Sequence, residues 1–350
     1  MPVSVVVGGQ YGSEGKGKVA LALARRERGE SVAVRVGGPN SGHTGYDLKG
    51  RRWILRQLPV AAVDGAHVIV LPAGSYVEPE LLLQEIASLG LNEKNVAISP
   101  QARVITAEHV HHELASRISA SIGSTGTGTG AAVVAAIQRN APNSGPRAVF
   151  ATDDERLRPF VKSTTDLLQD ALKDGRRIIV EGTQGFGLSP LHSPYWPNVT
   201  SRDTTAAGFL SEAGLSPLDV DDITLVLRSL PIRVSGNSGP LETETNWETV
   251  TSESGSPEDI REFTSVTKKL RRVGRFEFDI VKRAIAVNRP TRVVLNHLDY
   301  IDWSCRAGTL TSTAWEFINW VERGLARDVD WVGTGVDSFV QLRQKFAVRA

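Results

Sequence analysis

Two glycine-rich loops near the N-terminus carry the side chains best suited to chemistry. The stretch GGQYGSEGKGKVA, residues 8–20, places Lys16 and Lys18 among glycines directly after the apolar run 3–7. Backbone amides at a helix N-terminus, with lysines beside them, attract polyphosphate. The strict GxxxxGK[ST] pattern fails, because Gln10 replaces its first glycine and Gly17 replaces its metal-binding hydroxyl. The stretch therefore predicts a phosphate-binding turn that is not a Walker motif, with a purely structural glycine turn as the alternative.

The second loop, GGPNSGHTG at residues 37–45, follows another apolar run and contains His43. A lone histidine is more often structural than catalytic. Because this loop is expected to face the first one, we favour a catalytic role for His43. Its imidazolium would neutralise charge on a transferring phosphoryl group or protonate an oxygen.

The elements that position these loops are predicted from hydrophobic patterning. Apolar runs typical of strands buried on both faces cover residues 3–7, 31–36, 67–74, 176–182, 223–230 and 292–299. Helical spacing covers residues 14–28, 78–89, 107–121, 276–287 and 315–325. This alternation predicts an α/β fold with a doubly wound, mainly parallel central sheet and helices on both faces. Ligands bind at the carboxyl ends of such strands, where further glycine clusters fall at 37–38, 182–185 and 333–335.

The composition is that of an ordinary globular protein of 350 residues, with 41% hydrophobic and 23% charged residues. A net charge of +1 argues against a nucleic-acid partner, and no apolar stretch approaches the ~18 residues of a membrane helix. No leader precedes the first strand, so a cytosolic protein is expected. We expect residues 1–350 to form a single domain with insertions. Cys305, the lone cysteine, excludes an internal disulfide and is expected to be a small buried or half-buried filler.

Two polar segments complete the candidate site. GSTGTGTG at residues 123–130 contains hydroxyls suited to an anion, with a flexible linker as the alternative. TSESGSPED at 251–259 is expected to be a mobile loop, and it precedes KKLRRVGR at 268–275, which concentrates five cations in eight residues.

The two N-terminal loops resemble signatures of the adenylosuccinate synthetases, GTP-dependent ligases that join aspartate to C6 of inosine monophosphate. GGQYGSEGKGKV is similar to GxQWG[DE]EGKGK, and GGPNSGHT is similar to GGxNAGHT. The resemblance implies a catalytic His43, a magnesium ligand in the Gly42 carbonyl and a substrate contact at Asn40. It implies triphosphate contacts from Gly12, Ser13, Glu14, Gly15, Lys16, Gly17, Lys18, Gly42, His43 and Thr44.

Later motifs follow in the family's order over nearly the whole chain. IGSTGTGTG resembles IGTTGRGIGP, which implies that Ser124 and Thr125 bind the substrate phosphate. Arg139 matches an arginine that the partner subunit lends to that phosphate, which implies a homodimer. VEGTQG resembles FEGAQG and implies a catalytic contact from Gln184 to the purine O6 edge. VTSRDTTAAG resembles VTSSNTTAGG and gives Thr200 a further phosphate contact.

The family's remaining subsites fall near the C-terminus. TSVTKKLRR lies where the aspartate-binding loop belongs, with candidate ligands Ser265, Val266, Thr267, Lys269 and Arg271. NHLD and GTG lie where the donor base binds, which implies contacts from Asn296, His297, Asp299, Gly333, Thr334 and Gly335. His297 stands in place of the family's lysine, which weakens discrimination in favour of guanine. ATP or dATP is therefore favoured as the phosphate donor, with GTP as an alternative. The family's RPRR run reads KLRR at 269–272, which is compatible with a 2′-deoxy sugar.

Ser13 is the main departure, because the family holds there an aspartate that removes the N1 proton of inosinate and binds magnesium. A hydroxyl does neither well near neutral pH. A degenerate, non-catalytic paralogue is one interpretation, but the other motif residues are intact together. A smaller side chain instead leaves space for an amino group at purine C2, and its oxygen can accept from that group.

The chain therefore resembles the 2-aminoadenylosuccinate synthetases of bacteriophages whose DNA contains diaminopurine. This resemblance implies dGMP, L-aspartate and a nucleoside triphosphate as substrates, Mg²⁺ as cofactor and the host cytoplasm as location. Lys16, Lys18 and the loop amides would place the γ-phosphate in line with O6, and aspartate would displace phosphate from the 6-phosphoryl purine. The acceptor of the N1 proton stays open, with Ser13 acting through water or the triphosphate as candidates. Fold analogy adds closure of residues 251–268 over the site.

Overall fold

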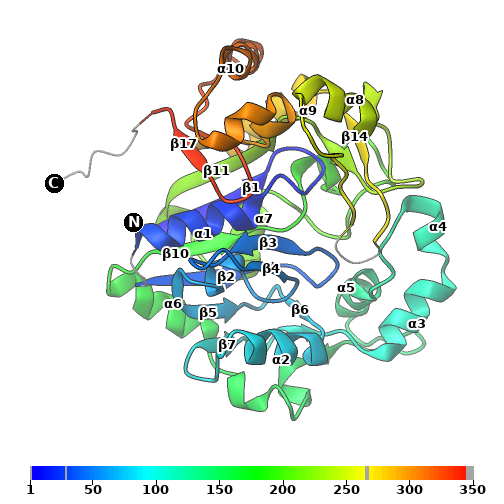
Figure 1. The fold of residues 1–350 in the computed structure, drawn as a ribbon. Helices are drawn as coiled ribbons and strands as arrows, with labels where there is room; N and C mark the ends of the chain where they lie inside the picture. The colour runs from blue at the N-terminus through cyan, green and yellow to red at the C-terminus, as the bar shows by residue number, and fades with distance from the viewer. Residues whose placement is uncertain (1, 28–29, 265–267, 344–350) are drawn as a thin grey trace.

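A nine-stranded sheet forms the centre of the computed structural model, which describes residues 2–27, 30–264 and 268–343 (Figure 1). The strand order is β17-β16-β15-β11-β1-β10-β2-β5-β7. All neighbouring pairs are parallel except the antiparallel pair β16–β17. The strands are β1 (Val3–Gly8), β2 (Ser31–Arg35), β5 (Ala66–Leu71), β7 (Val96–Ile98), β10 (Ile178–Glu181), β11 (Val220–Arg228), β15 (Arg292–Asn296), β16 (Trp331–Gly333) and β17 (Phe339–Gln341). The predicted mainly parallel α/β sheet is confirmed.

Helices cover both faces of this sheet. The α-helices of the described residues are α1 (Lys16–Arg26), α2 (Pro79–Ser88), α3 (Ala107–Ala115), α4 (Ile118–Ile122), α5 (Thr129–Gln138), α6 (Thr164–Lys173), α7 (Ala206–Ala213), α8 (Trp247–Ser254), α9 (Phe278–Asn288) and α10 (Ser312–Leu325). The helix expected at 107–121 breaks at Arg117, whose φ of 55° ends the regular geometry between α3 and α4. The loop expected at 251–259 begins four residues later, because residues 251–254 complete α8 before Gly255, with φ of 68°, ends it.

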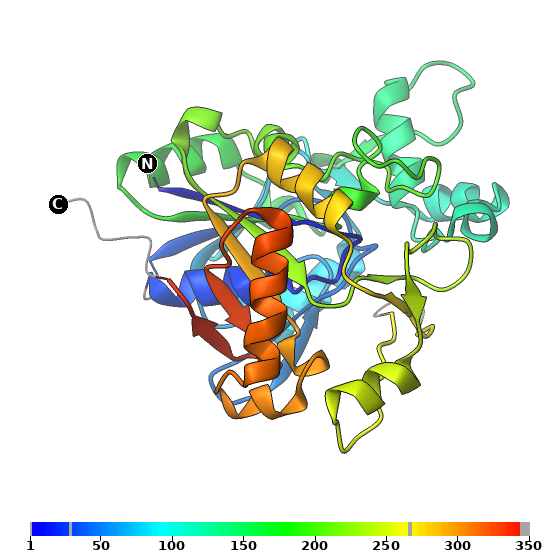
Figure 2. The same cartoon turned by 90° about the horizontal axis from the view of Figure 1, so that it is seen from above.

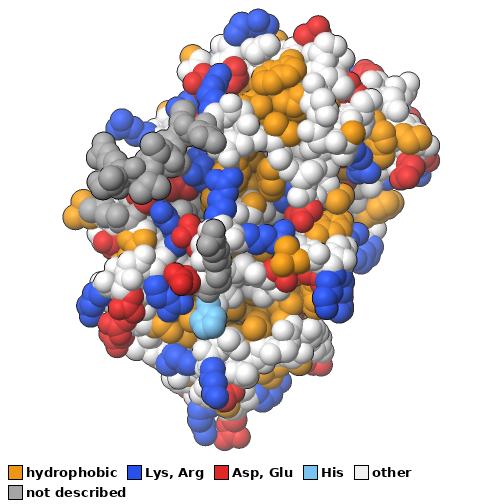
Figure 3. Space-filling model, turned by 60° about the vertical axis from the view of Figure 1, so that its left-hand side comes forward, with side chains coloured by type: hydrophobic (Ala, Val, Ile, Leu, Met, Phe, Trp, Pro, Cys, Tyr) orange, Lys and Arg blue, Asp and Glu red, His pale blue; other side chains and the backbone are white. Residues whose placement is uncertain are grey.

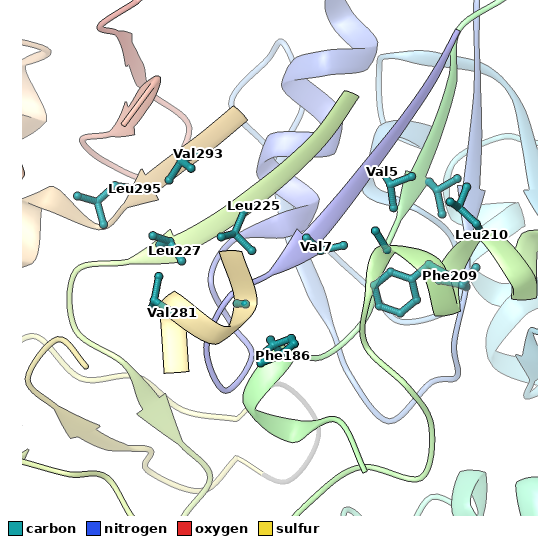
Figure 4. Packing of buried hydrophobic residues seen from close by; sticks show 14 of the residues in the cluster. Val5, Val7, Phe186, Phe209, Leu210, Leu225, Leu227, Val281, Val293 and Leu295 are labelled. Atoms are coloured by element: carbon teal, nitrogen blue, oxygen red, sulfur yellow. The ribbon is translucent and has the colours of Figure 1, made fainter. Parts of the chain in front are cut away.

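The core explains why the strands read as continuous apolar runs. Val5 and Val7 of β1 point into a cluster formed with α6, α7, α9 and α10, part of which is shown in Figure 4. Val6 points to the opposite face and packs with α1 residues such as Val19 and Ala20. Because successive side chains of a strand alternate between faces, a sheet covered on both sides needs apolar residues at nearly every position.

Short sheets supplement the central one. They are the hairpin β3 (His43–Tyr46) and β4 (Arg52–Leu55), the sheet of β12 (Ile232–Arg233), β14 (Arg272–Gly274) and β13 (Glu244–Thr245), and the sheet of β6 (Tyr76–Val77), β8 (Arg103–Val104) and β9 (Val149–Phe150). Figure 2 shows the segment with α3, α4 and α5 at one corner beyond the sheet and α8 at another. These strands are too short for their periodicity to be recognised in the sequence.

The surface mixes charges with a few exposed apolar side chains. Figure 3 shows cations and acids interspersed over one face, with hydrophobic side chains gathered near its top, at the height of α10. On that helix Trp315 and Trp320 are each 42% exposed. Cys305 is buried, as predicted. Among the described residues, no helix has both the length and the apolar character needed to cross a membrane.

Candidate active site

The first glycine loop joins β1 to α1 and is shaped by a buried carboxylate. Glu14 is fully buried, and it accepts hydrogen bonds from the backbone N–H of Gln10 at 3.1 Å and of Gly12 at 2.8 Å. Lys16 Nζ lies 2.6 Å from its other oxygen. Gly12 and Gly15 have φ of 93° and 91°, a region that favours glycine. Glu14, expected at the triphosphate, therefore lies beneath the loop and folds it, while the lysine is held at the helix N-terminus.

The second loop packs directly against the first, as the sequence predicted. A Cβ atom on Gly17 would lie 2.4 Å from Val60 Cγ2 and 3.0 Å from His43 Cβ, so only glycine allows this approach. His43 begins strand β3, and Thr44 follows it in the hairpin with β4. The imidazole and the N-terminal turn of α1 are therefore neighbours, with Gly42 directly before the histidine.

His43 is held by a buried arginine–glutamate pair. Its Nδ1 lies 2.6 Å from Glu181 Oε1, and Arg35 Nη1 lies 2.5 Å from the same oxygen and also contacts Nδ1. A carboxylate only accepts, so Nδ1 donates and the lone pair of the neutral ring is on Nε2. Burial, followed by the Arg35 charge, lowers the pKa of His43 to about 4. The imidazole is neutral at pH 7 without ligand, and an anion beside it would favour the imidazolium.

The carboxyl ends of β15 and β16 meet the start of α1. Asn296 Nδ2 donates to the carbonyl of Glu14 at 2.7 Å, and Lys18 Nζ donates to that of Gly335 at 2.7 Å. Burial lowers the pKa of Lys18 to about 8. A Cβ atom on Gly333 would lie 2.1 Å from Asn296 Oδ1, so glycine is required there. These contacts bring the predicted donor-base residues Asn296, Gly333, Thr334 and Gly335 to the first loop.

Two more predicted donor-base residues follow β15. Asp299 is buried, and its Oδ2 accepts from Arg306 Nε at 2.9 Å, while its Oδ1 has no hydrogen-bond partner among the described residues. Burial raises the pKa of Asp299. His297 has φ of 64°, and its ring centre lies 5.1 Å from that of Tyr300. Burial, followed by the charge of Arg228, lowers its pKa to about 3, so it is neutral.

Ser13 is exposed in the first loop, with φ of 58°, a region that non-glycine residues rarely occupy. Its hydroxyl accepts a hydrogen bond from the guanidinium of Arg271, and its carbonyl accepts from Arg228 Nη1 at 3.1 Å. Arg228 Nη2 lies 2.6 Å from Glu262 Oε1. This cluster joins the predicted aspartate-binding loop to the first glycine loop.

The other predicted aspartate ligands lie in the same loop. Lys269 donates its backbone N–H to Thr264 Oγ1 at 2.9 Å, and its side chain is exposed. Ser265, Val266 and Thr267 lie outside the described residues.

A polar hollow lies beside the ends of β2 and β10. It brings together three predicted nucleotide contacts, Asn40, Gln184 and Thr200, and its full lining is Gly38, Asn40, Thr129, Thr183, Gln184, Thr200, Ser201, Arg202, Asp203 and Thr204. Gln184 adopts φ of 61° in the turn after β10. Hydroxyl groups, amides and one cation dominate this lining, which suits an anionic ligand.

Of the predicted phosphate-binding segment 124–139, only Thr129 lines the hollow. The hydroxyls of Thr125 and Thr127 are 3.3 Å apart, and Thr127 lies 3.2 Å from Thr129, which lines the hollow. Ser124 donates to Glu113 Oε1 at 2.6 Å. Arg139, the C-cap residue of α5, is exposed and is not part of the lining.

The sequence motifs did not reveal the charged residues that position His43 and the Ser13 turn. Arg35, Glu181 and Arg228 are the last residues of β2, β10 and β11, where a charge closes an otherwise apolar strand. A charge at the carboxyl end of a doubly covered strand is a usable signal, because such strands end at the ligand-binding edge of the sheet. Glu262, which ends no strand, carries no comparable signal.

Glycine-rich loops, two buried lysines and an oriented imidazole at one sheet edge are typical of nucleotide-binding α/β proteins. The family model for adenylosuccinate synthetase matches residues 5–145 and 148–307. The chain therefore belongs to the adenylosuccinate synthetase family, and it is a ligase of purine biosynthesis that binds nucleotides.

Individual relatives agree with this assignment. Adenylosuccinate synthetases of Methanococcus aeolicus and Thermococcus onnurineus are both 33% identical, covering 96% of this chain and 97% and 96% of theirs. The structure of succinoaminodeoxyadenylate synthetase (PurZ) of cyanophage S-2L, bound to dGMP and to dATP as an energy donor, superposes with a TM-score of 0.81. It is 29% identical and covers 98% of this chain and 96% of its own. Adenylosuccinate synthetase from Plasmodium falciparum, 18% identical with a TM-score of 0.83 over 98% and 100% of the two chains, shows the shared fold.

Proposed function

We propose that this chain joins L-aspartate to C6 of dGMP, with hydrolysis of a nucleoside triphosphate, and forms 2-amino-N6-succinodeoxyadenylate for diaminopurine DNA. The observation that carries the proposal is Ser13, a small hydroxyl residue exposed in the first glycine loop. The similar cyanophage enzyme, whose structure contains dGMP, supports it. The reaction would take place in the host cytoplasm.

Ser13 suits an acceptor purine with an amino group at C2. Its oxygen has two lone pairs, one of which accepts from Arg271, so the other is available to an exocyclic amine. The loop conformation, with positive φ at Ser13, is supported from beneath by Glu14 and from the side by Arg228. A carboxylate would fill more of this space and would bind the Arg271 guanidinium more strongly than a hydroxyl does.

The first step is phosphoryl transfer. Lys16, Lys18 and the loop amides would bind the triphosphate, and Gln184 would bind the purine O6 edge. O6 attacks the γ-phosphorus while the bond to the bridging oxygen breaks and the N1 proton leaves, to water at Ser13 or to the triphosphate, which gives the nucleoside diphosphate and a 6-phosphoryl purine. Lys18, with a pKa of about 8, is mostly protonated at pH 7. His43 gains a proton as phosphate charge arrives beside it, so its imidazolium balances the developing charge.

The second step forms the new C–N bond. Lys269, Arg271 and Thr267 would hold the carboxylates of aspartate. The aspartate amine attacks C6, the C6–O bond breaks, and inorganic phosphate leaves. Ser124, Thr125 and Thr200 would hold the nucleotide phosphate during both steps, and Asn40 would contact the nucleotide. Excluding water from the phosphorylated intermediate is the main demand on the surrounding loops.

The oxygen atoms around the first loop fit a Mg²⁺ ion shared with the triphosphate. Glu14 already accepts three hydrogen bonds, so the Gly42 carbonyl is the protein oxygen that would bind the ion, and the Ser13 hydroxyl would bind it only in place of its bond to Arg271 or to the C2 amine. Mg²⁺ prefers oxygen ligands and commonly combines few protein ligands with phosphate oxygens and water. When bound, the ion would neutralise charge on the phosphates.

The donor subsite suits an adenine as well as a guanine base. The buried Oδ1 of Asp299, which lacks a partner among the described residues, can accept an N–H from either base. His297 is neutral and contacts Tyr300, so it adds no charge that favours guanine. We therefore propose ATP or dATP as donor, with GTP as a further possibility to be tested by competition.

A homodimer in which Arg139 is lent to the partner subunit is part of the proposal. Arg139 ends α5, and apolar side chains lie nearby on α5 and α3: Val134, Ile137 and Leu114 are 48%, 71% and 56% exposed. Exposed apolar side chains and arginines are both typical of protein interfaces. This surface supports association of two chains through α5.

A second candidate function is ordinary adenylosuccinate synthesis from IMP and GTP, which the 33% identical relatives favour. Purified protein with L-aspartate, Mg²⁺ and ATP or GTP would receive dGMP or IMP in parallel, and phosphate release would be followed. Faster release with dGMP is expected. Faster release with IMP would contradict the proposal, and nucleotide-dependent stabilisation without phosphate release would indicate a non-catalytic binding protein.

A further inference from the structure

Arg202 is a nearly buried cation in the lining of the polar hollow. Its side chain is 11% exposed, and it stands where the family pattern VTSSNTTAGG has a serine. Nη1 donates to the carbonyl of Gly74 at 2.7 Å, and Nη2 lies 3.0 Å from Glu212 Oε2. A guanidinium has five N–H donors, so donors remain available after these two bonds.

The surrounding residues fix the position of this guanidinium. A Cβ atom on Gly37 would lie 3.4 Å from Arg202 Nη2, and one on Gly74 would lie 2.3 Å from Glu212 Cβ. The guanidinium carbon also lies 5.0 Å from the centre of the Tyr76 ring. The Arg202 guanidinium is therefore held in one position between the loops after β2 and β5 and helix α7.

The other charged residue of the lining does not compete for Arg202. Asp203 Oδ1 accepts from Ser189 Oγ at 2.8 Å and from the backbone N–H of Thr204 at 2.8 Å, and its Oδ2 accepts from the Thr205 hydroxyl. The rest of the lining offers mainly hydroxyl and amide donors. A fixed guanidinium among hydroxyl donors is the arrangement that binds phosphate.

We propose that Arg202 is a specificity-determining residue that binds the 5′-monophosphate of the acceptor nucleotide, with Glu212 as its positioning partner. The inference rests on the proposed function only in taking a purine nucleoside monophosphate as acceptor, which dGMP and IMP share. Arg202 belongs to the same subunit as the hollow, so it would supply a cation in addition to the Arg139 that the proposed partner subunit would lend.

Calorimetric titration of wild-type protein and Arg202→Gln tests the proposal, with dGMP and deoxyguanosine in one pair and IMP and inosine in the other. Loss of charge-assisted bonds should weaken monophosphate binding about 10- to 100-fold and leave nucleoside binding unchanged. Arg177→Gln is the control, because Arg177 lies just before β10, at the opposite end of that strand from the site, and pairs with Asp221. Unchanged monophosphate affinity in Arg202→Gln would overturn the proposal.

Glu212→Gln should act in the opposite direction. Glutamine still accepts from Arg202 but removes a negative charge near the bound phosphate, so monophosphate affinity should rise a few-fold. Nucleoside binding that weakens together with monophosphate binding in both variants would identify a purely structural ion pair and would overturn the proposal.

Arg202→Lys keeps the test decisive if Arg202→Gln does not fold. Lysine retains the charge but lacks the planar guanidinium that can donate two parallel hydrogen bonds to phosphate. Monophosphate binding should therefore be about fivefold weaker, and wild-type affinity would contradict the assignment. Wild-type protein that binds IMP but not dGMP would refute the dGMP function alone, and the IMP and inosine titrations would then decide the role of Arg202. Wild-type protein that binds neither monophosphate would overturn both.

Discussion

Two fully buried arginines, Arg35 and Arg228, lie at the same edge of the central sheet, and they differ in what holds their glutamate partners. Arg35 and Glu181 are the last residues of the paired strands β2 and β10 and stand opposite each other in register. Arg228 ends β11, whereas Glu262 lies in an irregular segment between α8 and β14. One pair is built into the sheet, and the other joins a loop to it.

This difference separates two tasks within the site. The strand pair orients His43, which must be in place before any substrate arrives. The loop pair connects the Arg271 segment to the Ser13 turn, through the 3.1 Å contact from Arg228 to the Ser13 carbonyl. We infer that the chemistry of phosphoryl transfer is preorganised by the sheet, while the aspartate subsite depends on loop contacts.

The largest effect is expected from Glu181→Gln. The change leaves the buried Arg35 charge without a counter-charge, which should cost about 3–5 kcal/mol of unfolding free energy. It also weakens the bond that orients His43, so phosphate release should slow about 100-fold. Urea denaturation measures the first effect. The control is Asp221→Asn, since the partly exposed Arg177–Asp221 pair should contribute less than about 1 kcal/mol. Equal losses of unfolding free energy in the two variants would show that the buried pair stabilises the fold no more than the surface pair does.

The pH dependence of stability sharpens the account of the strand pair. The pKa of His43 is lowered from 6.5 to about 4 in the folded chain, so the unfolded chain binds more protons between these values. Stability should therefore fall as pH falls from 6.5 towards 4, by up to about 3 kcal/mol from this residue. His43→Asn should flatten that part of the profile in denaturation experiments at successive pH values. An identical slope in wild type and variant would contradict the depressed pKa.

A smaller effect is expected from Glu262→Gln in the loop pair. Stability should fall by about 1–2 kcal/mol, because Glu262 is partly exposed and its bond to Arg228 is weakened rather than lost. The KM for aspartate should rise about tenfold with kcat changed by less than about twofold. Glu253→Gln, which removes the exposed partner of Arg275, is the matched control. A loss in kcat as large as that of Glu181→Gln would show that both pairs serve the same task.

Much of the fold was predictable because its strands are covered on both faces. The six apolar runs correspond to β1, β2, β5, β10, β11 and β15. Short strands such as β7 and β17 were missed, since three residues carry no measurable period. The break at Arg117 was missed because the helical spacing continues through it, while the backbone does not.

The site was predictable where residues lie together in motifs and unpredictable where strands bring distant residues together. Lys16 and His43 follow from local glycine patterns. Arg35 and Glu181 are separated by 146 positions, and their contact arises only from the pairing of β2 with β10. Glu14 belongs to a motif, yet its inward direction follows from the turn geometry of Gly12 and Gly15.

The central claim concerns Ser13, and the ratio of kcat/KM for dGMP to that for IMP tests it most directly. The account predicts a ratio well above one in wild-type protein and a fall of at least about 100-fold in Ser13→Asp, because the carboxylate takes the space of the C2 amino group. Ser13→Ala is the control that keeps the space and removes only the acceptor oxygen, and it should lower the ratio by less. A wild-type ratio below one, or a ratio unchanged in Ser13→Asp, would contradict the account.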